Sequence, residues 1–324
     1  MGIRRYGRYI KRKIKTNIRL LHPGAVILMY HRISNVAYEP NWLAVSPENF
    51  SDHLNHINKH YNPLRLLELI QAIESGTIPR RSVVITFDDG YLNNLTQALP
   101  LLEAAHIPAT VFATAGFIGC DREFWWDQLS HILLASPSIP PDLSLNIGGT
   151  VYKWHTVTII DRQNTFSELK EVIKPLRASI KGKVLDYIVN WAGVKSELRQ
   201  DFRAMTVDEL KMLARSEYIE LGAHTVNHPI LPTLPYNEQV DEIVKGRNLL
   251  SEMVDLPIET FAYPNGDCDD HTARIVETAG YRGACTTTLG RVEAEDNLFR
   301  LKRCIVNDWD LDTFKRKMER YFHI

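Results

Sequence analysis

The chain has 324 residues, of which 44% are hydrophobic and 24% are charged, and its net charge is -1. This length suits one large α/β domain or two small ones with a sizeable core. The near-neutral charge gives no general affinity for nucleic acid. The four cysteines form no CxxC pair, so the sequence indicates neither a thiolate metal site nor a disulfide framework.

The first 22 residues form a basic segment that differs from the rest of the chain. Residues 1–20 carry eight positive charges and no negative charge, with apolar residues between them. No apolar stretch of signal-peptide length follows, and the run 25–30 is too short to span a bilayer. An amphipathic helix on an anionic membrane surface and a solvated tail both stay open. We expect a cytoplasmic protein, peripheral at the inner membrane if the helix forms.

Predicted strands and helices alternate through residues 23–324. Ser46 is a suitable N-cap for a helix that begins at Pro47, and Thr206 with Glu209 has the pattern of a capping box. The other predicted helices cover 64–75, 91–105, 206–214, 237–254 and 272–280. The predicted strands cover 25–30, 82–87, 109–113, 219–223, 260–263 and 282–288. Repeated strand-then-helix order predicts parallel strands with crossover helices, and about seven such units predict a barrel.

Residues from about 119 to 204 fit this alternation poorly. They contain a proline cluster, a polar strand-like piece at 146–155 and a helix at 161–176. We interpret them as an insertion in a single barrel domain, residues 23–324. An insertion at this point could border a substrate cleft.

Chemically active side chains follow four of the predicted strands, and such strand ends share one face of a parallel barrel. Adjacent carboxylates are costly to bury without a cation, whereas carboxylates with two imidazoles suit a divalent metal. A hydrogen-bonded histidine and a simple Asp-Asp-Gly turn are the alternative interpretations. The residues concerned are His31, Asp88, Asp89, His224, His228 and the turn Tyr263-Pro264-Asn265-Gly266.

Three of these segments resemble the motifs of the polysaccharide deacetylases, a family defined by the NodB homology domain. Thr86-Phe87-Asp88-Asp89-Gly90 and His224-Thr225-Val226-Asn227-His228 resemble the first two motifs, and Phe261-Ala262-Tyr263-Pro264-Asn265-Gly266 resembles the third. The similarity covers about residues 25–310, and the pattern is most like that of the poly-N-acetylglucosamine deacetylases. The resemblance implies a distorted (β/α)7-type barrel with an insertion, and a zinc-like metal that cleaves acetyl groups from sugars.

The resemblance also implies a role for each matching residue. Asp89, His224 and His228 would be the metal ligands, and Asp88 would be the general base that takes a proton from metal-bound water. The backbone N–H of Asn265 would stabilise the oxyanion together with the metal.

Two positions depart from the common family pattern. Ala262 stands where many members have an arginine that orients the base, and Leu301-Lys302-Arg303 stands where many have a Leu-x-His that supplies the general acid. Met29-Tyr30-His31 is similar to the early Tyr-His of the poly-N-acetylglucosamine deacetylases. We therefore expect His31 to be the general acid, with a purely structural hydrogen bond as the alternative.

Further residues are expected to contact the substrate. Tryptophan faces suit the apolar faces of pyranose rings, although each aromatic side chain could equally belong to the core. The expected contacts are Trp126, Asp127, Tyr263, Arg303 and Trp309.

The sequence therefore predicts a metal-dependent hydrolase that removes N-acetyl groups from an N-acetylglucosamine-like sugar, oligosaccharide or glycolipid. Zn²⁺ is the expected metal, with Co²⁺, Ni²⁺ or Mn²⁺ as substitutes. A hydrolase of O-acetyl esters or cyclic amides and a non-catalytic carbohydrate-binding barrel are the alternatives. Asp88 argues against the last of these, because a binding protein needs no general base.

Overall fold

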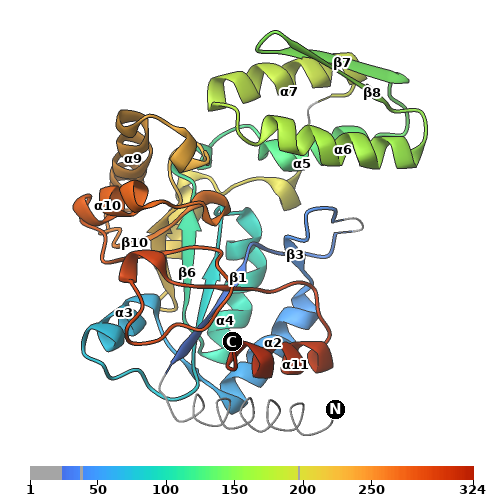
Figure 1. Cartoon of the computed structure of the whole chain (residues 1–324). Helices are drawn as coiled ribbons and strands as arrows, with labels where there is room; N and C mark the ends of the chain where they lie inside the picture. Colours follow the sequence, from blue (N-terminus) through green and yellow to red (C-terminus); the bar gives the residue numbers. More distant parts are fainter. Residues whose placement is uncertain (1–23, 37–38, 196–197) are drawn as a thin grey trace, which may run out of the picture.

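A computed structural model describes residues 24–36, 39–195 and 198–324 and shows a curled parallel sheet surrounded by helices (Figure 1). The basic segment, residues 1–22, lies outside the described residues. Seven strands run in the order β11-β10-β9-β6-β5-β1-β12, and β4 pairs with the start of β5. The strands are β1 (Ala25–Tyr30), β4 (Asn62–Pro63), β5 (Ser82–Phe87), β6 (Ala109–Ala113), β9 (Ile219–Ala223), β10 (Thr260–Ala262), β11 (Gly283–Cys285) and β12 (Cys304–Ile305). The predicted distorted (β/α) barrel is thus confirmed.

The two edges of the sheet are joined by residues 301–305. The Leu301 N–H donates to the carbonyl of Ala284 at 2.9 Å, and the Thr286 N–H donates to the carbonyl of Leu301 at 2.9 Å. Three residues after Leu301, β12 begins and pairs in parallel with β1. This short segment therefore connects β11 to β1, and the Leu301 side chain belongs to the interior cluster.

Alternate residues of each strand face the inside of the curl, as the period of two in a strand requires. The interior cluster includes Ile27, Val84, Phe112, Ala262 and Leu301, and side chains of α3 pack against it. Each such side chain stabilises the fold by about 1.5–3 kcal/mol on full burial. Below this layer, Glu220 accepts from the Thr110 hydroxyl at 3.2 Å and from the Leu66 N–H at 3.0 Å, while the polar side chains of the predicted site lie at the carboxyl ends of the strands.

Most of the helices lie outside the curled sheet, whereas α3 packs against its interior cluster. Two of the predicted start signals are confirmed. The Ser46 side chain accepts from the Asn49 N–H, and Thr206 and Glu209 form a reciprocal capping box. The predicted helix 91–105 is helical from residue 92 and contains a π-helical stretch, Asn94–Ala98, that leads directly into α4. Tyr91 itself pairs with Ala204 and takes part in a buried polar network. The helices are α2 (Pro47–His60), α3 (Leu66–Glu74), α4 (Leu99–Ala105), α8 (Val207–Ala214), α9 (Tyr236–Val254), α10 (Asp270–Thr278) and α11 (Leu311–Tyr321).

Part of the expected insertion forms a lobe beyond the barrel, at the top of Figure 1. It holds α5 (Trp125–Ser130), the antiparallel hairpin β7 (Asp142–Ile147) and β8 (Thr150–His155), α6 (Ile159–Ile173) and α7 (Ala178–Ala192). A smaller parallel pair, β2 (Arg32–Ile33) and β3 (Ala44–Val45), lies below the lobe. The exact limits of the insertion stay a prediction. Among the described residues, no helix has the length and apolar character needed to cross a membrane.

Candidate metal centre and active site

The ends of β5 and β9 bring Asp89, His224 and His228 together. One ligand atom from each residue lies within 4.8 Å of the others. The Oδ1 atom of Asp89 is 3.7 Å from Nε2 of His224 and 3.5 Å from Nε2 of His228. All three side chains are buried. The three residues expected to bind a metal therefore form one cluster at the carboxyl face of the sheet.

The backbone is strained at this cluster. Asp89, Thr225 and His228 have φ values of 75°, 66° and 54°, in the left-handed region that non-glycine residues rarely adopt. For Thr225, whose side chain is β-branched, this conformation is a true outlier. Such strain costs about 1–3 kcal/mol per residue and persists only where the surrounding structure imposes it, which is typical of functional sites.

Contacts from α9 and from the turn after β6 hold the strained loop. The Glu242 carboxylate accepts from the backbone N–H groups of Val226 and Asn227 at 2.9 and 2.8 Å. The Gly116 N–H donates to the carbonyl of Val226 at 2.9 Å. In α9, a Cβ added at Gly246 would lie 3.0 Å from the Thr225 carbonyl carbon. The helix can approach this loop because Gly246 has no side chain.

His224 presents the lone pair of Nε2 on the side of Asp89. The Nδ1–H of His224 donates to the carbonyl of Ala262 at 2.7 Å, which leaves Nε2 as the acceptor. Burial lowers the pKa of His224, and it lowers the pKa of His228 well below its ordinary value. Both rings are therefore neutral near pH 7, which is the form that binds metal ions.

Asp89 carries a buried oxygen with no partner among the described residues. Its Oδ1 accepts no hydrogen bond. Burial, and then the charges of Asp88 and Asp127, raise the pKa of Asp89 well above its ordinary value. A carboxylate in this position is costly unless a cation lies beside it. The residues therefore fit a divalent ion, and three protein ligands are the number found in catalytic zinc sites.

Asp88, the neighbour of Asp89, is held by Arg303. The two terminal nitrogens of Arg303 donate to the two carboxylate oxygens of Asp88, each at 2.7 Å. The Nε–H of Arg303 donates to the carbonyl of Thr286 at 2.9 Å. Arg303 was expected to contact the substrate, but its side chain is fully buried and its guanidinium is bound to protein groups. It orients Asp88 from the segment that joins β11 to β12.

The charge of Arg303 also fixes the protonation state of Asp88. Burial alone would raise the pKa of Asp88, but Arg303, and to a lesser extent His224, outweigh burial and hold it well below its ordinary value. Asp88 is therefore ionised throughout the neutral range and can accept a proton.

His31 follows β1 on the same face and is half-buried. Its carbonyl accepts from the Asn94 side chain at 2.8 Å. Burial lowers the pKa of the His31 imidazole to about 4, although the charge of Asp88 acts in the opposite direction. The ring is thus neutral at pH 7 and lies in the electrostatic field of Asp88.

The turn after β10 carries Asn265 and Tyr263, two of the expected site residues, and they differ in exposure. Asn265 is exposed and adopts a φ of 58°, and its carbonyl accepts from the Thr287 hydroxyl at 3.0 Å. Tyr263, in contrast, is fully buried, and its hydroxyl donates to the carbonyl of Phe299 at 2.9 Å. Tyr263 therefore supports the turn, although the sequence suggested that it contacts the substrate.

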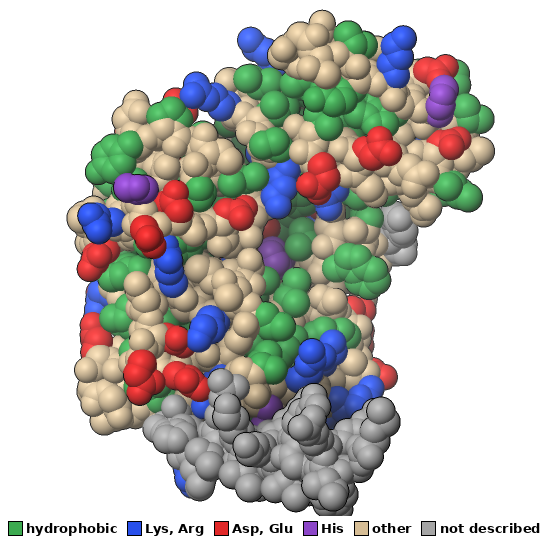
Figure 2. All heavy atoms as spheres, viewed as in Figure 1, with side chains coloured by type: hydrophobic (Ala, Val, Ile, Leu, Met, Phe, Trp, Pro, Cys, Tyr) green, Lys and Arg blue, Asp and Glu red, His purple; other side chains and the backbone are tan. Residues whose placement is uncertain are grey.

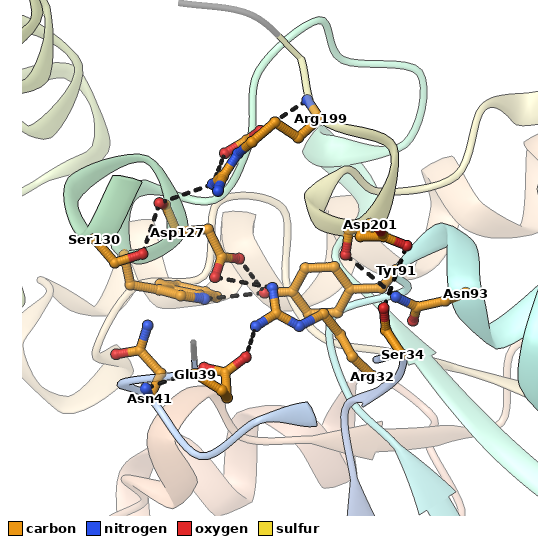
Figure 3. A network of polar contacts seen from close by, with 12 residues as sticks. Arg32, Ser34, Glu39, Asn41, Tyr91, Asn93, Asp127, Ser130, Arg199 and Asp201 are labelled. Carbon is orange, nitrogen blue, oxygen red and sulfur yellow. Dashed lines mark hydrogen bonds and ion pairs between the residues drawn. The ribbon is translucent and has the colours of Figure 1, made fainter. Parts of the chain in front are cut away.

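Asp127 belongs to a buried polar network (Figure 3), and Trp126 joins this network through Tyr91. Asp127 accepts from Arg32 at 3.0 Å and from the Tyr91 hydroxyl at 2.7 Å. The Tyr91 hydroxyl in turn accepts from the indole N–H of Trp126 at 2.9 Å. The Trp126 ring packs against the His228 imidazole, with centroids 4.8 Å apart. The network thus connects Arg32, the residue after His31, to a candidate metal ligand.

The burial of Asp127 and Trp126 bears on the expectation that both residues contact the substrate. Asp127 is fully buried, and burial raises its pKa to about 6 although Arg32 acts to lower it. Trp126 is 8% exposed. Neither side chain offers a free face to a sugar, in contrast to the expectation, and both instead support the metal cluster.

The network continues into the link between the lobe and the barrel (Figure 3). Arg199 pairs with Glu123 at 2.6 Å, donates to the carbonyl of Asp127 at 3.0 Å and stacks on Phe202 at 3.7 Å. The Ser34 hydroxyl donates to Asp201 at 3.2 Å. Sequence reasoning missed these pairs because the partners lie far apart in the chain.

Trp309, the last expected contact, is half-buried on the same side of the barrel. Its carbonyl is 2.8 Å from Nε2 of His53, and its side chain lines a groove that also contains Trp42. Figure 2 shows a hollow in the surface between the barrel and the lobe, with a histidine side chain visible inside it.

A family model described as polysaccharide deacetylase matches residues 75–136 and 187–284. The chain belongs to the polysaccharide deacetylase family. The matched stretches contain Asp88, Asp89, His224 and His228, and the unmatched residues between them include the hairpin and α6. The enzyme class expected from the sequence, a hydrolase of carbon–nitrogen bonds other than peptide bonds, is the class of this family.

Curated relatives agree with this membership. A Bacillus subtilis (strain 168) protein named as a polysaccharide deacetylase, YxkH, is 22% identical over 283 residues, covering 87% of this chain and 71% of that protein. The poly-beta-1,6-N-acetyl-D-glucosamine N-deacetylase of Escherichia coli (strain K12) is 29% identical over 97 residues, which is 29% of this chain but 14% of that protein.

Solved structures share the fold. The Streptococcus pyogenes deacetylase PplD in complex with acetate matches with a TM-score of 0.60 and 20% identity, covering 92% of this chain and 99% of that chain. IcaB from Ammonifex degensii matches with a TM-score of 0.59 and 17% identity, covering 93% and 98%. At these identities the likeness establishes the architecture.

Proposed function

We propose that this family member removes N-acetyl groups from a hexosamine sugar, with a divalent metal, Zn²⁺ by preference, held by Asp89, His224 and His228. The observation that carries the proposal is the unpartnered, buried Oδ1 of Asp89, which faces two neutral imidazoles beside the ionised Asp88. A bound ion of this kind would lower the pKa of water and polarise the acetyl carbonyl.

The residues of the chain supply the remaining steps. Asp88, ionised and oriented by Arg303, takes a proton from the attacking water. The backbone N–H of Asn265 is assigned to the acetyl oxygen as negative charge develops on it. The carbon–nitrogen bond then breaks as the amine takes a proton, which we assign to His31. Because the His31 imidazole is neutral near pH 7, it takes up the proton that Asp88 removed from water and then passes it to the amine.

The proposed substrate unit is N-acetylglucosamine-like. Support comes from the relatives named as poly-beta-1,6-N-acetyl-D-glucosamine N-deacetylases, in Escherichia coli and in Staphylococcus aureus. An amide substrate also suits a site that pairs a base with a separate acid, since an amine leaving group requires a proton.

The test is an amine-release assay with zinc-loaded protein on β-1,4- and β-1,6-linked N-acetylglucosamine oligomers. The proposal predicts equal amounts of free amine and acetate. His224→Ala should lose both bound metal and turnover, whereas Asp88→Asn should keep the metal and lose turnover. Acetate release from acetylated xylan without amine release from any oligomer would favour the O-acetyl esterase alternative.

The place of the reaction is a separate part of the proposal. The basic residues 1–20 support peripheral binding to an anionic membrane at the cytoplasmic face, at about 1 kcal/mol per charge near the surface. A glycolipid substrate would suit that location. Deletion of residues 1–20 should reduce sedimentation with anionic vesicles, and raised salt should have the same effect on the full chain. Unchanged sedimentation in both cases would reject membrane binding.

A further inference from the structure

We propose that a groove beside the catalytic centre, with Trp42 as its exposed aromatic wall, binds further sugar units of a glycan chain. This inference rests on the proposed function and narrows it, because it makes the substrate an oligosaccharide or polysaccharide of neutral N-acetylated sugars. Free monosaccharides would leave the groove unused.

Trp42 is both exposed and strained. The side chain is 69% exposed, and the backbone adopts a φ of 59°. A bulky residue with positive φ is a conformational outlier. An indole that stays exposed to solvent contributes little hydrophobic stabilisation to the fold. Neither feature helps the chain to fold. Their combination at one residue therefore indicates a functional role for the indole.

The loop that carries Trp42 is fastened on two sides. On the barrel side, Glu39 pairs with the buried Arg32 of the network in Figure 3, and Glu39 also accepts from the Asn41 N–H at 3.0 Å. On the lobe side, the Lys170 ammonium of α6 donates to the Asn41 side chain at 2.7 Å. The position of Trp42 is thus set in advance by the same arginine that holds Asp127.

Two hollows meet at Trp42. The first, about 400 Å³, lies towards Trp309 and contains Ser34, Asn35 and Asn307. The second, about 560 Å³, lies towards α6 and contains Gln163 and Ser167. Both include Glu39 and Trp42, so the two hollows adjoin at this loop, one towards the barrel and one towards the lobe, and together we treat them as the groove.

The chemistry of the walls matches a neutral sugar chain. Several charged side chains are already bound within the protein: Glu39 to Arg32, Lys170 to Asn41, and Asp308 to Ser46 at 2.7 Å. Besides these groups and the exposed carboxylate of Glu171, the walls offer amides, hydroxyls and two indoles. Amides and hydroxyls hydrogen-bond to sugar hydroxyls, while indole faces pack on the apolar faces of the rings.

The groove is also correctly placed relative to the reaction. Ser34 lines it, and Ser34 is three residues along an extended segment from His31. Three such residues span about 10 Å. The Ser34 end of the groove therefore lies within about 10 Å of His31, near enough for units of one glycan chain to occupy both places.

The experiment compares wild type with Trp42→Ala on N-acetylglucosamine oligomers of one to six units. We expect Trp42→Ala to raise KM about tenfold for the longest oligomers, with kcat and the values for the shortest accepted substrate changed less than twofold. Trp42→Phe should restore most of the affinity for long oligomers. Tyr236→Ala, at an aromatic residue that is 66% exposed on α9 and outside the groove, should change nothing.

Binding is measured separately by calorimetry in the Asp88→Asn background, so that failure of the groove and failure of the proposed reaction can be told apart. Length-dependent binding that Trp42→Ala abolishes supports the groove even if wild type releases no amine. A loss that is equal for short and long oligomers, or no oligomer binding at all, would overturn the inference. A wild-type dimer that Trp42→Ala dissociates would also overturn it and assign the groove to a second copy.

Discussion

Arg303 and Asp88 form a bidentate ion pair in which each terminal nitrogen lies 2.7 Å from a different carboxylate oxygen. Asp88 follows β5, whereas Arg303 stands in the segment that joins the two edges of the sheet. Ala262, at the position where the family pattern places an orienting arginine, faces the apolar interior. This chain therefore holds its candidate base with a guanidinium from a different strand.

Replacing Arg303 should impair the base and spare the metal. Arg303→Met should reduce turnover by roughly 10²-fold and leave metal binding near the wild-type level. Without the guanidinium the pKa of Asp88 rises, so the acid limb of the kcat/KM profile should move to higher pH. The depressed pKa of Asp88 also stabilises the fold above its unfolded value near 4, and this contribution is lost as the pH falls.

Removing one partner of a buried pair costs about 3–5 kcal/mol, so Arg303→Met needs a stability control. The double variant Arg303→Met/Asp88→Asn should regain much of the lost stability and remain inactive. An Arg303→Met enzyme with an unchanged pH profile would show that Arg303 is only structural.

Asp89 should destabilise the fold when the metal is removed. In chelated protein at pH 7, Asp89→Asn should raise the free energy of unfolding by roughly 1–3 kcal/mol, because it removes a buried, unpartnered charge. The folded-state pKa of Asp89 is raised, so the stability of the chelated wild type should increase relative to the variant as the pH falls from 7 to 5.

The free energies of unfolding of wild type and Asp89→Asn are measured by denaturant unfolding at pH 7 and pH 5, with and without zinc. Zinc should stabilise the wild type and have no effect on Asp89→Asn. If Asp89→Asn is less stable than the chelated wild type at pH 7, the Asp89 carboxylate must have a stabilising partner in the metal-free protein, and the prediction is wrong.

Two helical glycines give a matched test of how the His loop is held. Gly182 of α7 has open space around it, with Arg122 as the nearest group at 3.7 Å, whereas a Cβ at Gly246 would press on Thr225 at 3.0 Å. Gly182→Ala should stabilise the protein by about 0.5–1 kcal/mol without changing metal affinity. Gly246→Ala should weaken zinc binding at least tenfold, which is the usual scale for displaced supporting contacts. Equal metal affinity in both variants would argue against this role of Gly246.

Tyr91 should act on the metal through Trp126. Tyr91→Phe removes the hydroxyl that connects Asp127 to the Trp126 indole. We expect about tenfold weaker zinc binding, because Trp126 packs on His228, together with a lower free energy of unfolding. Zinc titration followed by competition with a chelator separates the two effects. Reduced stability with unchanged zinc affinity would make the network purely structural.

The sequence was informative where local chemistry decides the structure. The limits of β1, β5, β6 and β9 agree with the predicted strands, because each is an apolar run that ends in polar residues. The metal cluster could also be predicted, since Asp89, His224 and His228 all follow such strands.

Contacts between distant segments could not be predicted in the same way. Arg303 lies 215 residues from Asp88, and Arg32 lies 95 residues from Asp127. No local pattern reports such pairs, because they depend on which strands become neighbours in the curled sheet. The groove around Trp42 could not be predicted for the same reason, because it depends on how β3 and α6 are placed in the fold.

The central claim, hydrolysis at Asp89, His224 and His228 with Asp88 as the base, is tested most directly by a zinc titration of chelated protein. Amine release from N-acetylglucosamine oligomers is followed as zinc is added. The account predicts no turnover before zinc and a rise that saturates at about one ion per chain, with Asp88→Asn binding the ion equally but staying at least 10²-fold slower. Full turnover in the chelated protein, or no amine release at saturating zinc, would contradict it.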